Sequence, residues 1–171
     1  RVARMVAGQP FDKVWFGLHG SFAKTGWGHG THQALLAGAL GLREDGEQLR
    51  NAYDLAAERG VEYEFEELEL PDAHENTARI RFYHTDGSQS EIEGSSIGGG
   101  RILITRIDGM PAGFSAEAPT LLITQRDVKG VVSEISRTLD MEDINIGVKR
   151  VSREARGRTA RIPHRYLQRD Y

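Results

Sequence analysis

The sequence predicts an α+β protein in which a mostly antiparallel sheet domain with two helices is followed by a smaller, truncated βαβ unit. Three observations carry this prediction. The hydrophobic period changes from helical to alternating near residue 61, Asp86–Gly87 is a strong hairpin signal, and a new strand–helix–strand pattern begins at Leu121. The predicted domains are residues 1–114 and 119–171.

The first elements are a strand, a loop and two helices. Residues 11–19 form a bulky apolar segment between Pro10 and Gly20, which is typical of a buried strand. A glycine-rich loop fills residues 20–30, and Thr31 is a suitable N-cap for a helix with apolar residues at 34, 35, 36, 39 and 40. A more polar helix is predicted from residue 45 to its C-cap at Gly60.

Strands follow the two helices. Apolar residues alternate with glutamates from Val61, and again with arginines from Ala78, as in half-buried strands. A return strand after Asp86–Gly87 ends at Ile97, the Gly98–Gly100 run breaks the pattern, and residues 102–107 suggest another strand. Residues 111–119 are predicted to be a linker.

The second unit is predicted as strand 121–124, helix 131–141 and strand 144–152. Val131, Ile135 and Leu139, with Val132 beside them, define the apolar face of the helix. The sequence after Ala160 is basic and nearly without periodicity. It therefore predicts an incomplete, partly disordered sheet.

Composition limits the possible functions. The 171 residues are 39% hydrophobic and include no cysteine, which excludes disulfides, thiolate metal sites and cysteine nucleophiles from this chain. No apolar run is long enough to span a membrane and no signal peptide is evident, so a cytoplasmic protein is expected. The net charge is −3, but residues 149–171 alone carry +6. We interpret that tail as a solvated end, because no aromatic platform or basic helix indicates nucleic-acid binding.

The loop Gly26–Thr31 is the first candidate site. It follows a strand and opens a helix, an arrangement that binds anions through backbone N–H groups and the positive helix end. A glycine-rich turn without a ligand explains the same residues equally well. The neighbouring histidines at 19, 29 and 32 match no familiar metal motif, so no metal site is predicted.

Asn76 is the second candidate, because its side-chain amide can both donate to and accept from an amino-acid ligand. The alternative at residues 72–77 is an ordinary Asx turn. No Gly-x-Ser-x-Gly elbow surrounds any serine, which argues against hydrolase chemistry.

Three segments together resemble a known family: GSFAKTGWGHGTHQALLAGALGL (20–42), HENTARI (74–80) and SIGGGRI (96–102). They are similar to the beta subunit of bacterial iron–sulfur-dependent L-serine dehydratase (L-serine ammonia-lyase). Residues 121–154 resemble the first half of an ACT domain, a small ligand-binding module. The resemblance covers the chain to about Thr159.

The resemblance implies a lyase of amino-acid metabolism that converts L-serine to pyruvate and ammonia. In this family a [4Fe-4S] cluster acts as Lewis acid and is bound by a separate alpha subunit. The expected partners are therefore that alpha subunit and L-serine, with possible homodimerisation through the ACT unit. The chain is not expected to be active alone, and the resemblance identifies no catalytic residue in it.

The family motifs map onto ten residues that we expect to line a small-carboxylate site or the interface with the alpha subunit: Gly28, His29, Gly30, Thr31, His74, Asn76, Thr77, Gly98, Gly99 and Gly100. In the ACT unit the expected ligand loop includes Asp127 and Gly130. The family commonly has Asp where His32 stands and Pro where Glu75 stands, and its serine-rich segment upstream of position 1 is not among these residues.

Two other functions remain open from the sequence. One is an amino-acid-sensing module related to the regulatory region of phosphoglycerate dehydrogenase. The other, which the sequence favours least, is a nucleic-acid binder that uses the basic tail.

Overall fold

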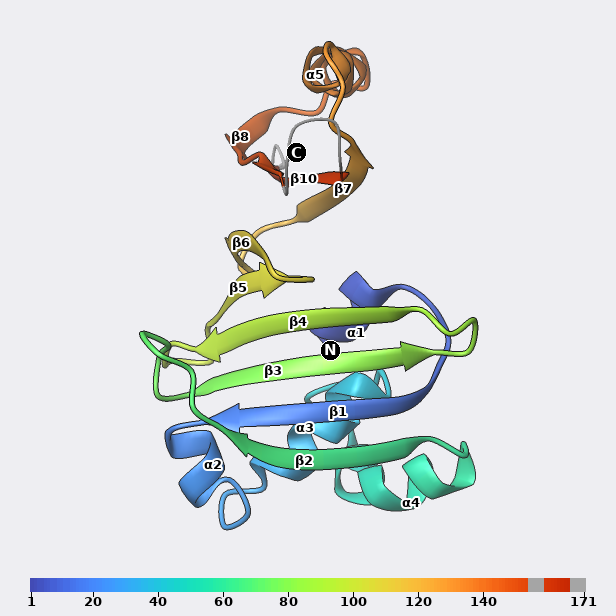
Figure 1. The fold of residues 1–171 in the computed structure, drawn as a ribbon, viewed down its shortest axis with the longest axis vertical. Helices are drawn as coiled ribbons and strands as arrows, with labels where there is room; N and C mark the ends of the chain where they lie inside the picture. The colour runs from blue at the N-terminus through green and yellow to red at the C-terminus, as the bar shows by residue number, and fades with distance from the viewer. Residues whose placement is uncertain (154–158, 167–171) are drawn as a thin grey trace. The chain divides into compact units, whose positions relative to one another are not determined.

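A computed structural model describes residues 1–153 and 159–166, and of residues 153 and 159–166 it describes only the backbone. The chain divides into two compact units, Arg1–Gly109 and Met110–Tyr171. The sequence-based boundary at 114–119 falls inside the second unit, between its first two strands. The elements are shown in Figure 1.

The helices of the first unit are α1 (Val2–Ala7), α2 (Ser21–Thr25), α3 (Thr31–Ala39), a 3₁₀ helix η1 (Glu47–Asn51) and α4 (Ala52–Glu58). Its strands are β1 (Phe11–His19), β2 (Glu62–Leu68), β3 (Thr77–His84), β4 (Gln89–Ser96) and β5 (Ile102–Ile107). The α+β class is confirmed, and β1 has the predicted bounds. The short helices α1 and α2 were not predicted, because neither is long enough to show a helical period.

The strands of the first unit lie in the order β2-β1-β3-β4-β5. Every neighbouring pair is antiparallel except β1 and β2, which run parallel with Phe16 opposite Phe65. A parallel pair needs a crossover between its strands, and α2, α3, η1 and α4 supply it.

The core lies between the helices and one face of this sheet. Strand residues alternate between two faces, and the face toward the helices carries the fully buried Val14, Phe16, Phe82 and Ile92. On α3 the buried residues include Leu36 and Ala37. Burial of these side chains fixes the register, because a slip by one residue would expose them all.

Charged side chains occupy the opposite face of the sheet. Arg79 pairs with Glu93 at 2.9 Å, and Arg81 pairs with Glu91, whose hydrogen bond raises the pKa of the Arg81 guanidinium. The Arg81 guanidinium also lies 5.2 Å from the centre of the Trp15 ring. These alternating arginines and glutamates explain why the period in this part of the sequence is so regular.

The second unit contains β6 (Met110–Ser115), β7 (Thr120–Arg126), α5 (Val131–Met141), β8 (Ile146–Lys149), β9 (Ser152–Arg153) and β10 (Thr159–Tyr166). The predicted strand–helix–strand core is confirmed. On α5, Leu139 is buried and Val131 and Ile135 are partly buried, whereas Val132 is exposed.

Two predictions for this unit were wrong. The predicted linker contains β6, whose buried Met110 and Ala112 alternate with exposed Pro111, a strand period that the proline obscured. The basic segment after Ala160 forms β10, which pairs with both β7 and β8. Backbone pairing does not require an apolar alternation in β10 itself. Residues 154–158 and 167–171, which include part of the basic tail, lie outside the described residues.

Candidate functional site

The candidate residues of the first unit gather around one end of its sheet. There β1 ends at His19, β2 ends at Leu68, β4 ends at Ser96, and β3 begins at Thr77. Helix α2 begins at the same end (Figure 1). The segments that carry the family resemblance therefore converge because of the strand directions, although they are far apart in sequence.

Gly20 joins two of these segments. Its backbone has φ 57° and ψ −122°, and a Cβ there would lie 2.6 Å from the carbonyl oxygen of Glu75. Next to it, the Ser21 N–H donates to that same carbonyl at 2.7 Å. Only glycine combines this conformation with so close an approach, so Gly20 holds the 74–77 segment against the start of α2.

The 74–77 segment is organised by local hydrogen bonds. The Asn76 N–H donates to His74 Nδ1 at 3.1 Å, which leaves the ring proton of a neutral His74 on Nε2. The Thr77 hydroxyl donates to the His74 carbonyl at 2.6 Å and lies 2.7 Å from the Ser95 hydroxyl. Thr77 is therefore buried as a structural anchor, whereas His74 is exposed.

The Gly98–Gly100 loop lies beside this segment, because Thr77 pairs with Ser95 and the Ser96 N–H donates to the Asn76 carbonyl. All three glycines have left-handed backbones, with φ of 86°, 61° and 74°, and a Cβ on any of them would meet open space. Their conformation, not crowding, selects glycine. Within the described part of the chain, no hydrogen bond engages their N–H groups or the Asn76 side chain.

The Gly28–Thr31 turn connects α2 to α3. Its N–H groups are partly used: His29 donates to Thr25, Gly30 to Trp27, and Thr31 to the Gly26 carbonyl. The residues from 27 to 30 are exposed, and Gly30 rather than Thr31 is the N-cap of α3. Among the described residues, no hydrogen bond links this turn to segments 74–77 or 98–100.

Two features of the turn were not predicted. Trp27 stacks on His32 with ring centres 3.8 Å apart, and His32 in turn meets the edge of Phe65. His32 is buried, and its Nδ1 atom has no hydrogen-bond partner among the described residues. The exposed tryptophan between two glycines was the available signal, but its partner depends on the packing of β2 against α3.

The three histidines near the loop have different surroundings. Leu70 N–H donates to His19 Nδ1 at 3.2 Å, His29 is exposed, and His32 lies beneath Trp27. The described residues contain no group of three His, Asp or Glu side chains placed to hold a metal ion. Asp127 and Gly130 lie before α5 in the second unit, where Gly130 is the N-cap with φ 97°.

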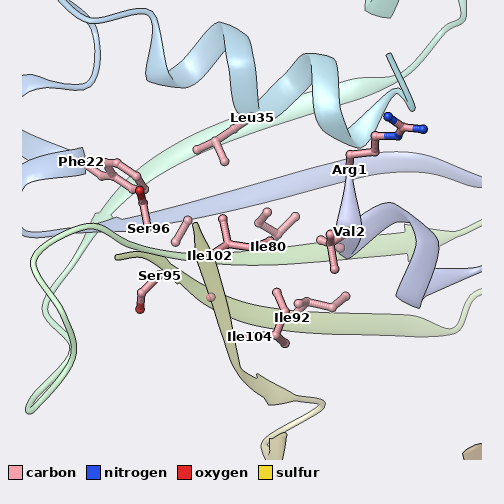
Figure 2. A pocket seen from close by; sticks show the side chains of 13 residues that line it. Arg1, Val2, Phe22, Leu35, Ile80, Ile92, Ser95, Ser96, Ile102 and Ile104 are labelled. Carbon is pink, nitrogen blue, oxygen red and sulfur yellow. The ribbon is translucent and has the colours of Figure 1, made fainter. Parts of the chain in front are cut away.

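An apolar cavity of about 200 Å³ lies between the sheet and the helices of the first unit (Figure 2). Its walls include Ile80, Ile92, Ile102 and Ile104 from three strands, with Leu35 of α3 opposite them. Ser96 is one of the few polar residues that line it. Such a lining suits hydrocarbon, so the cavity is not the predicted carboxylate site.

The fold and site define a two-unit α+β chain with a cluster of unpaired amide donors at one end of its first sheet. No family model matches it. It is 37% identical over 146 residues, 85% of its length, to the L-serine dehydratase beta chain of Peptoniphilus asaccharolyticus, of which it spans 66%. It is 33% identical over 160 residues, 94% of its length, to the probable L-serine dehydratase beta chain of Bacillus subtilis (strain 168), of which it spans 72%. The chain belongs to the family of L-serine dehydratase beta chains. In the described residues, no helix is long and apolar enough to cross a membrane.

Proposed function

We propose that this chain is the beta subunit of a complex that converts L-serine to pyruvate and ammonia. The observation that carries the proposal is the convergence of the 74–77 and 98–100 segments, which the family resemblance singled out, into one cluster of unused polar groups. The names of the two relatives support the substrate and the need for a second subunit.

The cluster suits the two ends of an amino acid. Successive N–H groups of Gly98–Gly100 provide donors for a carboxylate, and the exposed His74 Nε2–H adds another. The Asn76 amide can accept from an ammonium group and donate to an oxygen. In this proposal the chain binds and orients L-serine at this end of the sheet.

The iron–sulfur cluster belongs to the alpha subunit in this proposal. A [4Fe-4S] cluster is held by cysteine thiolates, and the sequence contains no cysteine. The residues of this chain therefore do not fit such a cluster, and no step through it follows from their arrangement.

The proposal includes self-association through the second unit. Among the described residues, seven of the ten exposed large hydrophobic side chains belong to it: Leu121, Val128, Val132, Met141, Ile144, Val148 and Val151. Exposed apolar surface gathered in one small unit is typical of an interaction surface. Sedimentation of the chain as a monomer at all micromolar concentrations would refute this part of the proposal.

The test of the proposal is anaerobic pyruvate production from L-serine, by the chain alone and with the cysteine-bearing alpha chain. We expect activity only in the mixture. Asn76→Ala should lower kcat/KM about 10- to 100-fold, the usual effect of losing a hydrogen bond to a charged group. Asn51→Ala, which removes an exposed asparagine without a side-chain cap bond, is the matched control.

A second pair of variants tests the glycine loop. Gly99→Ala and Gly60→Ala both place a Cβ in open space on a left-handed backbone, with φ of 61° and 64°. The two substitutions should lower the free energy of unfolding by similar amounts. A loss of activity confined to Gly99→Ala would therefore support a role for the Gly98–Gly100 loop in binding. An inactive wild-type mixture would refute the function, and equal activity of the two glycine variants would refute the loop's role.

A further inference from the structure

Three aromatic side chains with exposed surface lie in a row along the edge strand of the first sheet. Trp27 is 69% exposed, Tyr63 is 40% exposed and Tyr53 is half-buried. The ring centres of Tyr53 and Tyr63 are 5.7 Å apart, and Phe65 lies between Tyr63 and Trp27, 6.0 Å from each. One face of the Trp27 indole stacks on His32, which holds the ring in place and leaves its other face open. We call Trp27, Tyr53 and Tyr63 the aromatic row.

The aromatic row is assembled from three separate elements. Tyr63 and Phe65 are two residues apart on β2, so both point to the same face of the sheet. Tyr53 belongs to α4 and Trp27 to the turn after α2, and Figure 1 shows α2 and α4 near opposite ends of β2. Exposed rings brought together in this way mark an interaction site, because scattered single residues are the normal state of a free surface.

The surroundings of the aromatic row are strongly acidic. Residues 52–69, which include α4 and β2, contain one arginine and seven acidic residues, a net charge of −6, whereas the whole chain carries −3. Glu64 pairs with Lys13 at 3.2 Å, and Glu66 accepts from the Trp15 indole N–H. The other five acidic side chains are exposed and have no partner among the described residues: Asp54, Glu58, Glu62, Glu67 and Glu69.

Charge on an edge strand also has a simpler role, which is to discourage other strands from pairing with it. Among the described strands, β2 pairs with β1 alone, so its other edge needs such protection. That role explains the glutamates but not the exposed tryptophan and tyrosine, which favour association. Two copies of this acidic surface repel each other, so the row does not pair with itself. It fits a different chain of opposite charge.

We infer that the aromatic row and its acidic surroundings form the docking surface for the alpha subunit, which presents arginine and lysine side chains to it. Tryptophan and tyrosine are the residues that most often dominate the binding energy of an interface, and guanidinium groups are attracted to the faces of their rings. The unpaired carboxylates attract the basic partner and exclude acidic ones. The inference rests on the proposed function because it requires an alpha subunit.

The Gly28–Thr31 turn takes its place in the same surface. The sequence left it open whether this turn lines a carboxylate site or an interface with the alpha subunit. Its neighbour Trp27 belongs to the aromatic row, and among the described residues no hydrogen bond links the turn to residues 74–77 or 98–100. The interface role therefore suits the turn better.

The first test measures the Kd of the alpha chain for variants of the row. Trp27→Ala and Tyr63→Thr should each raise the Kd about 10- to 100-fold, because each removes an anchor of the interface. Threonine at position 63 keeps a high strand propensity. Met5→Ala is the matched control, because Met5 is 72% exposed but lies on α1, which packs against α3 and β4. Its Kd should change less than about twofold.

The second test measures the association rate constant and its dependence on salt. The double variant Glu62→Gln with Glu67→Gln should lower the rate constant at low salt about threefold or more and flatten its salt dependence. The control, Asp140→Asn with Glu142→Gln, removes two exposed charges from the second unit. It should change the rate constant less than about 1.5-fold. At saturating alpha chain, Tyr63→Thr should reach the wild-type kcat, because a docking residue does not touch the substrate.

Several outcomes would overturn the inference. These are wild-type Kd values for Trp27→Ala and Tyr63→Thr, an equal rise in Kd for Met5→Ala, an association rate that salt does not slow, or a self-association that Tyr63→Thr abolishes. Circular dichroism establishes that each variant is folded before its affinity is compared. An active complex whose Kd is unchanged by the row variants would leave the proposed function standing and refute only the docking surface. Absence of any complex with the wild-type chain would refute both.

Discussion

Replacing Gly20 by alanine should cost far more stability than a glycine replacement made in open space. Gly20 has φ 57°, and an added Cβ would lie 2.6 Å from the Glu75 carbonyl oxygen and 2.9 Å from its Cα. With ψ of −122° this backbone lies outside the left-handed helical region, and holding an L-residue there costs about 1–3 kcal/mol. Overpacking against a backbone that cannot move aside adds about 1–3 kcal/mol. The expected loss is therefore about 2–6 kcal/mol.

Gly60→Ala is the control for placing a side chain on a backbone with positive φ. Gly60 has φ 64°, and a Cβ there would meet nothing within 4 Å. It should cost only the backbone contribution of about 1–2 kcal/mol. The difference between the two variants then measures the steric contact with Glu75 together with the extra strain of the Gly20 backbone, whose ψ is −122°.

Urea denaturation followed by tryptophan fluorescence is the suitable assay. Both tryptophans of the chain, Trp15 and Trp27, lie in the first unit, so the signal does not mix the unfolding of the two units. Equal losses in Gly20→Ala and Gly60→Ala, to within about 0.5 kcal/mol, would refute the argument that Gly20 fixes the 74–77 segment by close approach.

Three further predictions concern the same unit. Phe82→Ala should cost about 3–5 kcal/mol in urea denaturation, because Phe82 is fully buried; a loss below 1 kcal/mol would contradict the described core. Thr77→Val and Ser95→Ala should be non-additive by about 0.5–1.5 kcal/mol, because their hydroxyls lie 2.7 Å apart; strict additivity would argue against that bond. Hydrogen bonds from Ser88 lower the pKa of the Asp86 carboxyl. The ionised carboxyl therefore stabilises the folded chain above the ordinary aspartate pKa, and this stabilisation is lost as the pH falls through the lower folded value. Asp86→Asn should therefore lose less stability than the wild type between about pH 4 and pH 2, and identical pH profiles would contradict this.

Local sequence determined the elements whose ends are marked by special residues. Strand β1 was predicted to the residue because Pro10 and Gly20 bound a bulky apolar run. The β3–β4 hairpin was predicted by Asp86–Gly87, and the Gly87 backbone indeed has φ 84°. These signals act within a few residues, so the sequence displays them directly.

Local sequence did not predict which strands pair with each other. The alternation in β2 predicted a strand, but nothing in it indicated that this strand would pair in parallel with β1 across the helices and turns of residues 20–61. Likewise β10 forms by pairing with strands on both sides, and its own sequence does not alternate. Pairing depends on tertiary context, which outweighs local propensity in strands.

The candidate site also has a part that local sequence predicted and a part that depends on long-range packing. Its glycines and polar residues were found in the sequence because they need special backbone conformations or carry side-chain amides. The stack of Trp27 on His32 was missed because it depends on how the turn folds back over α3 and on the position of Phe65 in β2. The long-range contact changes the chemistry of the turn, since it buries a histidine that its helix position alone does not bury.

The hydrogen bonds around His74 bear on how the proposed reaction is divided between subunits. Elimination of water from L-serine gives an enamine that water then hydrolyses to pyruvate and ammonia, and the elimination requires a base that removes a proton from the α-carbon. His74 Nδ1 already accepts from the Asn76 N–H, so the neutral ring presents Nε2–H outward and can donate but not accept there. The Asn76 amide and the Gly98–Gly100 N–H groups are not bases either. In the proposed function these residues therefore bind and orient the substrate, and the proton acceptor is a group outside this cluster.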